Sequence, residues 1–297
     1  MCGIVSLFPK QPELEPRVGA LLADMLCQMT ERGPDSAGFA LYRDAVPDGQ
    51  VKLTLQSESV RADWGDLHGR LRKLDGHATL ADHGNHAVVL TAIAPAEALA
   101  WLEANASDYR VTSWGRSIEI YKEKGSPEHV IEQLHLRELG ATHALGHTRM
   151  ATESAVTTEH SHPFSTGLDL CLVHNGSLSN HNRLRDRLTE AGIHFQTDND
   201  SEVAAGYLTH RLAEGDSLEQ ALDHAIRDLD GFYTFAIGTR DGFAVLRDPI
   251  ACKPAVLAET DEWVAMASEF RAIATLPGAE TAHTWEPEPA RVYSWER

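Results

Sequence analysis

The chain opens with an apolar, β-branched run, MCGIVSLFP, which ends at Pro9. Such a run predicts a buried strand that begins almost at the N-terminus. Chain ends are normally frayed and exposed to solvent, so a buried start is unusual. The fold must therefore accommodate a first strand that lies in its interior.

The hydrophobic periodicity of the remaining chain indicates an α+β fold. Apolar residues recur at helical spacing over residues 15–31, and residues 36–43 alternate as a strand. Strands that run into loops follow from residue 141, three helices are predicted between residues 180 and 229, and strands with tight turns complete the chain. Helices between two blocks of hairpin-linked strands indicate two sheets packed face to face under helical layers.

A central segment, at about residues 45–135, differs from its surroundings. A polar stretch rich in Asp and His is followed by a strand, a helix and two more strands. This order predicts a small α+β insertion with a minor core of its own. The chain is therefore expected to form one domain over residues 1–297, interrupted by an inserted module that serves in docking or as a spacer.

The charge balance excludes several classes of partner. The formal net charge is -18, with 44 acidic against 26 basic residues. Such a chain repels nucleic-acid backbones and anionic membrane surfaces. No signal sequence opens the chain, and no apolar stretch approaches the roughly 18 to 20 residues that span a bilayer. We expect a cytoplasmic protein without nucleic-acid or membrane partners.

Cysteine and histidine usage does not predict a metal site. The four cysteines are far apart and form no CxxC pair, and the 16 histidines are scattered without companion ligands at a metal-site spacing. Cys27 and Cys171 lie in apolar patterns and are expected to be buried core thiols. We expect neither a metal nor a cofactor.

Cys2 combines two reactive groups if Met1 is removed, as is usual before a small residue. The residue then carries a thiol and a free α-amino group. The amine has an ordinary pKa near 7.7 to 8.0 and the thiol one of about 8.5, so the amine can accept the thiol proton near neutrality. The alternative is that Cys2 simply occupies a buried strand as a small apolar residue.

Five motifs place this cysteine in a wider pattern. They are MCGIVSLF at the start, RGPDSAG at 32–38, GHTRMAT at 146–152, HNGSLSN at 174–180 and DNDSE at 198–202. In this order they resemble the class II, or N-terminal nucleophile (Ntn), glutamine amidotransferases. The resemblance covers about residues 1–45 and 140–297. It implies the four-layer αββα sandwich of the Ntn hydrolases.

The resemblance also implies catalytic roles. Cys2 matches the nucleophile that attacks the side-chain amide of glutamine and forms a γ-glutamyl thioester. Asn175 and Gly176 match the oxyanion hole, which supplies one side-chain amide and one backbone N–H. An Asn-Gly dipeptide is also a common hairpin turn, but no matching return strand follows it here.

Substrate-binding residues are implied in the same way. Arg149 matches the arginine that binds the α-carboxylate of glutamine, and Asp200 matches the acid that receives its α-ammonium. The alternatives are a surface ion pair for Arg149 and a helix N-cap for Asp200. Thr152 and His162 fall near positions that line the glutamine pocket. Arg32 matches a position close to the nucleophile, where a purely structural role is an equal alternative.

Two positions depart from the family pattern. Met150 stands where an aromatic residue often follows the arginine, and Glu153 stands where a histidine often follows the threonine. The pocket wall is therefore expected to differ. Two other functions stay open: a non-catalytic regulatory subunit, and an Ntn amidohydrolase that acts on another amide.

The resemblance implies a partner protein as well. Members of the family pass ammonia to a synthase, and no synthase motif is recognisable in this sequence. The RGPDSAG motif, the overall length and the central insertion look most like amidotransferase subunits of glutamate-synthase-like complexes, including N-methylglutamate synthase. We therefore expect glutamine as substrate and a synthase subunit as partner.

Overall fold

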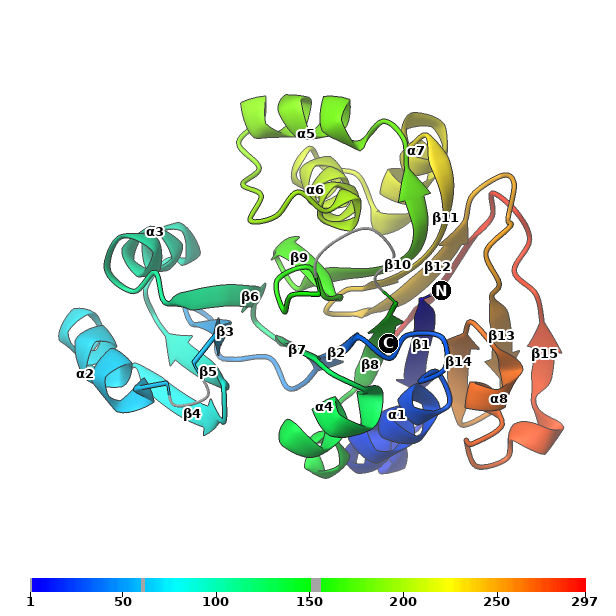
Figure 1. The fold of residues 1–297 in the computed structure, drawn as a ribbon, viewed down its shortest axis with the longest axis horizontal. Helices are drawn as coiled ribbons and strands as arrows, with labels where there is room; N and C mark the ends of the chain where they lie inside the picture. The colour runs from blue at the N-terminus through cyan, green and yellow to red at the C-terminus, as the bar shows by residue number, and fades with distance from the viewer. Residues whose placement is uncertain (1, 60–61, 151–155) are drawn as a thin grey trace.

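The computed structural model describes residues 2–59, 62–150 and 156–297. Their strands form a seven-stranded, a five-stranded and a four-stranded sheet (Figure 1). Neighbouring strands are antiparallel in all three sheets. No helix in these three ranges is both long and apolar enough to cross a bilayer.

The two larger sheets face each other. Across the first, the strands are β15 (His283–Trp285), β13 (Val256–Glu259), β14 (Trp263–Ala267), β1 (Gly3–Pro9), β8 (His143–Arg149), β2 (Ser36–Tyr42) and β7 (Ile118–Lys124). Across the second, they are β16 (Val292–Glu296), β12 (Gly242–Arg247), β11 (Gly231–Gly238), β10 (Leu170–Leu178) and β9 (Phe164–Gly167). Phe8, Tyr42, Leu145, Val173 and Phe243 belong to one buried cluster contributed by both sheets.

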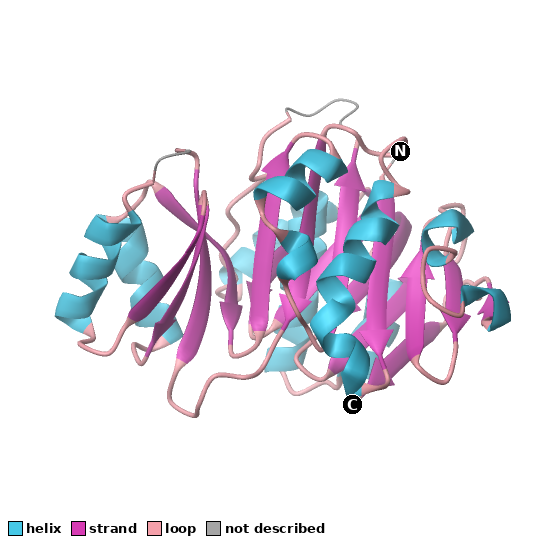
Figure 2. Ribbon diagram, turned by 90° about the horizontal axis from the view of Figure 1, so that it is seen from below, coloured by secondary structure: helices cyan, strands magenta, loops and turns pink. Residues whose placement is uncertain are grey.

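Helices cover both outer faces. The seven-stranded sheet carries α1 (Val18–Cys27), α4 (Pro127–Gln133) and α8 (Phe270–Ile273), and Figure 2 shows this helical layer lying over the strands. The five-stranded sheet carries α6 (Asp200–Ala213) and α7 (Leu218–Asp228), and α5 (His181–Glu190) packs on α6. Short 3-10 helices lie at η1 (Pro12–Arg17), η2 (Leu136–Glu138) and η3 (Ala279–Thr281). The four layers confirm the expected αββα sandwich.

The first strand is apolar along its whole length because both of its faces are covered. Val5 and Leu7 pack in the cluster beneath α1, whereas Ile4 and Phe8 pack between the two sheets. All seven residues of β1 are buried. The sequence of a strand that is buried on both faces is continuously apolar instead of alternating between apolar and polar residues.

The inserted module has its own sheet and core. It contains β3 (Val51–Ser57), α2 (Trp64–Leu74), β4 (Thr79–His83), β5 (His86–Thr91), α3 (Pro95–Asn105) and β6 (Tyr109–Gly115). Its sheet has the order β4-β5-β3-β6, and Leu53, Leu67, Val89 and Leu102 lie in its core. Within the range of about 45–135, β7 and α4 instead join the seven-stranded sheet and its helical layer.

The first helix is shorter than its periodicity predicts. An α-helix was expected over residues 15–31, but η1 precedes α1 and α1 ends at Cys27. The carbonyl oxygen of Met29 accepts bonds from the backbone of Arg32 and Gly33 and from Oγ1 of Thr148. These bonds turn the chain back toward the start of β1 and place Arg32 beside Cys2.

Candidate active site

Cys2 directly precedes the start of β1 and lies next to the end of β8. In the β1–β8 ladder Gly3 is opposite Thr148, so the next step of the register brings Cys2 opposite Arg149. Arg149 is the last residue of β8 and is only 6% exposed. The backbone N–H of Asp35 donates to its carbonyl oxygen, which ties the RGPDSAG segment to the same corner.

Asn175 and Gly176 approach Cys2 from the opposite sheet. Nδ2 of Asn175 donates a hydrogen bond of 3.3 Å to the carbonyl oxygen of Cys2. Both residues lie inside β10, where they pair with Thr234 and Tyr233 of β11. The Asn-Gly pair is therefore strand and not a hairpin turn.

Gly176 occupies a position that only glycine fits. Its φ is +156°, and a Cβ there would lie 2.0 Å from the carbonyl oxygen of Phe232 and 2.7 Å from Nε2 of His174. Any side chain would collide with the backbone of β11 and twist the ladder. The glycine therefore keeps β10 continuous at the point where Asn175 reaches Cys2.

Arg32 contacts Cys2 from the helical side of the seven-stranded sheet. Its Nε donates to the carbonyl oxygen of Cys2 over 2.9 Å, and its Nη1 donates to Oε1 of Glu269 over 2.8 Å. The Arg32 guanidinium and then Arg271 hold the pKa of Glu269 below its usual range. Arg32 thus bridges the backbone of Cys2 to the residue just before α8.

Asp200 is the first residue of α6 and joins that helix to β10. Its Oδ2 accepts a hydrogen bond of 2.9 Å from the backbone N–H of Leu178, two residues after Gly176. The N-cap of α6 is Asn199, whose side chain accepts from the backbone of Ser201. The interpretation of Asp200 as a simple N-cap is therefore wrong.

His162 belongs to a buried histidine group beside Asp200. Its Nε2 lies 2.9 Å from Oγ of Ser201, and Nδ1 of His174 lies 2.8 Å from the same oxygen. The ring of His162 stacks on His147 with centroids 3.9 Å apart, and Nε2 of His147 lies 2.9 Å from the carbonyl oxygen of His174. Burial lowers the pKa of His162 well below its usual range and that of His147 to about 3, so both rings are neutral.

Neutral rings define the hydrogen-bond pattern around Asn175. A neutral histidine carries one N–H, and Nε2 of His147 must carry it in order to donate to the carbonyl oxygen of His174. That carbonyl belongs to the peptide group that leads directly into Asn175. His147 therefore holds the backbone from which the Asn175 side chain extends.

The environment of the Cys2 thiol favours its protonated form. Burial raises the pKa of Cys2, and a hydrogen bond from the backbone of Met150 and the charges of Arg149 and Lys253 only partly offset this effect. A buried thiolate is costly because it loses its hydration. Nucleophilic attack by this sulfur therefore needs a base close at hand.

Two of the positions singled out in the sequence fall outside the described residues. They are Thr152 and Glu153. Met150 is described, and its side chain is 37% exposed. Within the described ranges, no group of three or more His, Cys, Asp or Glu side chains is arranged to hold a metal ion.

Four residues of this corner were not predicted from the motifs. His147 and His174 stand inside GHTRMAT and HNGSLSN, and Ser201 stands inside DNDSE, so the motifs contained them without indicating their contacts. Glu269, the partner of Arg32, carries no local sequence signal. It lies 237 positions from Arg32, and only the folded sheet brings the two together.

Comparison with known proteins agrees with this arrangement. Residues 147–275 match the family described as glutamine amidotransferase domain. The chain is 56% identical over 297 residues to the glutamine amidotransferase-like protein GlxB of Rhizobium meliloti, covering 100% of this chain and 98% of that protein. It is 31% identical over 312 residues to a putative glutamine amidotransferase of Methanothermobacter thermautotrophicus, with 99% of each chain covered.

The fold also matches a solved structure. Glutamine phosphoribosylpyrophosphate amidotransferase from B. subtilis, complexed with ADP and GMP, superimposes with a TM-score of 0.62 at 18% identity. The match covers 99% of this chain and 49% of that one, so the chain spans about half the length of this structural relative. At this identity the likeness establishes the fold alone. The two full-length relatives show that this chain belongs to the glutamine amidotransferase family and is an enzyme of that type, with the fold of the class II members.

Proposed function

We propose that Cys2, with its α-amine freed by removal of Met1, is the nucleophile of the glutaminase reaction. The thiol passes its proton to the α-amine, and the sulfur forms a bond to the side-chain amide carbon of glutamine. The C–N bond then breaks, and the proton returns from the α-ammonium to the leaving nitrogen, which departs as ammonia. Water hydrolyses the γ-glutamyl thioester to glutamate and restores the thiol.

The contact that carries this proposal joins the two sheets. Asn175 of β10 donates to the main chain of Cys2 at the start of β1, so an amide donor already lies beside the sulfur-bearing residue. Gly176 follows it with a backbone N–H in the same strand. One side-chain and one backbone donor can stabilise the negative oxygen that develops when sulfur attacks an amide.

The raised pKa of the Cys2 thiol supports a built-in base. A thiol that stays protonated at neutral pH cannot attack until its proton is removed. The buried histidines are poor bases, because the pKa values of His147 and His162 are depressed by burial. The α-amine of Cys2 itself has an ordinary pKa of about 7.7 to 8.0 and lies on the same residue as the thiol.

For the substrate, we assign the free amino-acid group of glutamine to Arg149 and Asp200. The register places Arg149 opposite Cys2, and Asp200 is bonded to β10 two residues beyond Gly176. A guanidinium offers paired donors to a carboxylate, and a carboxylate receives an ammonium. Thr152 and His162 are proposed to line the same pocket. Such a clamp favours free glutamine over other amides.

We further propose that the ammonia passes to a partner synthase of the glutamate-synthase-like or N-methylglutamate synthase type. The chain covers 98% of the Rhizobium meliloti relative, so that protein has no room for a large fused synthase. Purification of the chain from its native cell, with identification of the bound protein, tests this assignment. Recovery without a synthase would count against it.

Replacement of the nucleophile tests the core of the proposal. Cys2→Ala is expected to abolish release of ammonia from glutamine while the thermal unfolding transition is retained. Mass spectrometry of the active protein should show a chain that begins at Cys2. Wild-type turnover in Cys2→Ala, or full activity in a chain that keeps Met1, would disprove the mechanism.

The two alternatives differ from the proposal in measurable ways. A non-catalytic regulatory subunit would bind glutamine without releasing ammonia, alone or with its partner. An amidohydrolase for another substrate would cleave N-acyl amides better than glutamine. The wild-type protein is expected to prefer glutamine, because Arg149 and Asp200 recognise both charged groups of a free amino acid.

A further inference from the structure

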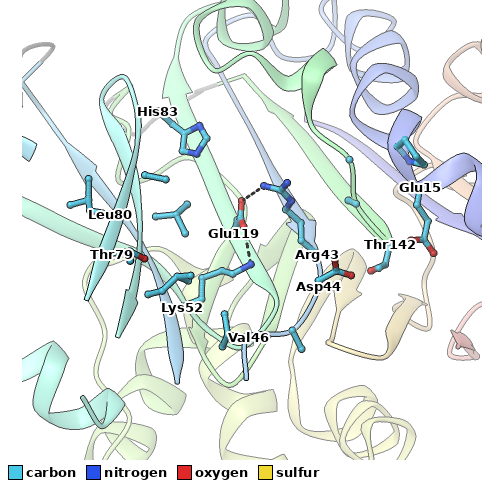
Figure 3. A pocket seen from close by; sticks show the side chains of 17 residues that line it. Glu15, Arg43, Asp44, Val46, Lys52, Thr79, Leu80, His83, Glu119 and Thr142 are labelled. Atoms are coloured by element: carbon cyan, nitrogen blue, oxygen red, sulfur yellow. Dashed lines mark hydrogen bonds and ion pairs between the residues drawn. The ribbon is translucent and has the colours of Figure 1, made fainter. Parts of the chain in front are cut away.

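The inserted module and the main domain border a cavity of about 580 Å³ at the Thr142 end of β8, opposite to the end that meets Cys2. We call it the insertion cavity. Its lining includes Arg43, Lys52, Leu80, Val88, Leu90 and Glu119 (Figure 3). Among the residues that the structure describes, none of those proposed for catalysis or glutamine binding lines it. Its volume lies within the range of about 300–1,000 Å³ that is typical of small-molecule sites.

Three charged side chains form one wall of the insertion cavity. Nζ of Lys52 lies 2.8 Å from Oε1 of Glu119, and Nη1 of Arg43 lies 3.4 Å from Oε2. The hydroxyl of Tyr121 donates to Oε2 over 2.9 Å. The side chains of Lys52 and Glu119 are 6% and 4% exposed. Removal of such a pair from water is costly, so the pair is not a strong source of stability.

The wall has unused hydrogen-bond donors. Lys52 has three N–H groups, and its contacts are Glu119 and, at 3.5 Å, the carbonyl oxygen of Ser117. Arg43 has five side-chain N–H groups, and among the described residues its guanidinium has Glu119 as its hydrogen-bond partner. The Arg43 side chain is 40% exposed, so its other donors are accessible. These donors are available to a ligand in the cavity.

The charge balance of this wall favours a ligand that carries a single negative charge. Burial raises the pKa of Glu119, but Lys52 and then Arg43 more than offset it and keep the carboxylate ionised. Lys52 and Arg43 together with Glu119 leave one net positive charge. Asp44 and Glu15 also line the cavity beyond Arg43 (Figure 3), and Glu15 is paired with Arg297. These carboxylates disfavour a ligand with several negative charges.

The opposite part of the cavity is apolar. Ala81 comes from β4, and Val88 and Leu90 come from β5, so the module supplies this surface while Arg43 follows the end of β2. Ala81 is exposed, Leu90 is half-buried, and Val88 is 7% exposed. An aliphatic group placed there would lose its contact with water. We propose that the insertion cavity binds a small organic monocarboxylate, with its carboxylate on Arg43 and Lys52 and its apolar part on Ala81, Val88 and Leu90.

Binding of sodium hexanoate, followed by calorimetry in a buffer free of carboxylates, tests the proposal. One molecule should bind per chain with a Kd of about 1 mM or lower, as a ligand of this size permits. Arg43→Gln should weaken binding by about tenfold or more, because it removes a charged donor. Arg70→Gln is the matched control, because Arg70 lies on α2 of the inserted module and outside the cavity lining. This change should leave the Kd unchanged.

Three further measurements distinguish binding in the insertion cavity from adsorption to an apolar surface and from binding in the glutamine pocket. Hexan-1-ol and hexyl phosphate should bind more weakly than hexanoate, because one lacks the charge and the other carries too much. Lys52→Met combined with Glu119→Gln removes the buried pair together and should also weaken binding. Hexanoate should still bind to Arg149→Gln, whose change lies in the glutamine site.

The opposite results overturn the proposal. They are absence of saturable binding, equal binding of hexanoate by Arg43→Gln, or binding lost in Arg149→Gln and kept in Arg43→Gln. The last result would place hexanoate in the glutamine pocket. Because the readout is binding and not ammonia release, failure of the Cys2 mechanism would not affect this test.

Discussion

Arg32 donates its Nε–H to the carbonyl oxygen of Cys2 over 2.9 Å. The contact is made by a buried guanidinium whose second bond goes to Glu269, so the position of Cys2 is linked to the start of α8. An arginine in this place can orient Cys2, the proposed nucleophile, without touching the substrate. We therefore interpret Arg32 as a positioning residue.

Arg32→Lys should lower kcat while leaving KM for glutamine nearly unchanged. A lysine keeps the charge but has no planar fork to bond Cys2 and Glu269 together. Misplacement of a reacting group by about 1 Å costs on the order of 100-fold in rate. Arg271→Lys is the matched control, because Arg271 also pairs with Glu269. Equal loss of activity in both variants would contradict a specific role for Arg32.

Gly176→Ala should reduce kcat by about 100-fold, the typical effect of losing one oxyanion donor. The added Cβ would meet the Phe232 carbonyl oxygen at 2.0 Å, so β10 must move. Gly192→Ala is the control: its φ is +90°, but a Cβ there meets no atom within 4 Å. Steady-state kinetics and urea unfolding of both variants separate backbone strain, about 1–3 kcal/mol, from loss of the donor. Equal kcat values in the two variants would disprove the assignment of Gly176 to the oxyanion hole.

Asp200→Asn should raise KM for glutamine, because it removes the charge that we propose receives the α-ammonium. The new side chain can still accept from the N–H of Leu178, so β10 and α6 stay joined. We expect a loss of about 10- to 100-fold in kcat/KM, in line with a hydrogen bond to a charged group.

Glutaramate, which is glutamine without its α-amine, provides the matched substrate for this variant. Wild type should prefer glutamine over glutaramate, and Asp200→Asn should lose much of that preference. Arg149→Gln should instead lose discrimination against 4-aminobutanamide, which lacks the α-carboxylate. An unchanged KM in either variant, or an unchanged preference, would refute the two-residue clamp.

Acid should destabilise the folded protein through its buried histidines. Burial lowers the pKa of His86 to about 3, of His143 to about 4 and of His147 to about 3. Below the ordinary histidine pKa of about 6.5, the unfolded chain binds protons that the folded chain does not. The free energy of unfolding therefore decreases as the pH is lowered, until the pH reaches the pKa values of the folded protein. Each histidine contributes a slope of up to about 1.4 kcal/mol per pH unit.

His143→Gln should remove one such contribution from the pH dependence. A glutamine amide can still donate to the carbonyl oxygen of Thr239, which lies 2.8 Å from Nε2 of His143. Urea unfolding between about pH 4.5 and 6 measures the slope. The exposed His77→Gln serves as control and should leave the slope as in wild type. A slope in His143→Gln that equals the wild-type slope would show that His143 does not contribute to the pH dependence of stability.

Local sequence was sufficient to predict the enzyme family and the layered fold. The buried run from Gly3, the helical spacing of α6 and α7 and the order of five motifs follow from neighbouring residues, and the four layers and the family agree with them. Apolar periodicity reports which face of an element is covered, and a motif reports chemistry that is local to a turn or strand end.

Tertiary structure decided which distant side chains meet. The shortening of α1 depends on bonds between Met29 and Thr148, 119 positions apart. Arg32 meets Glu269, and Arg43 and Lys52 meet Glu119, only after the sheets and the inserted module have packed. Hydrogen bonds and buried ion pairs of this kind depend on sub-ångström distances between residues far apart in the chain, and no local pattern encodes those distances.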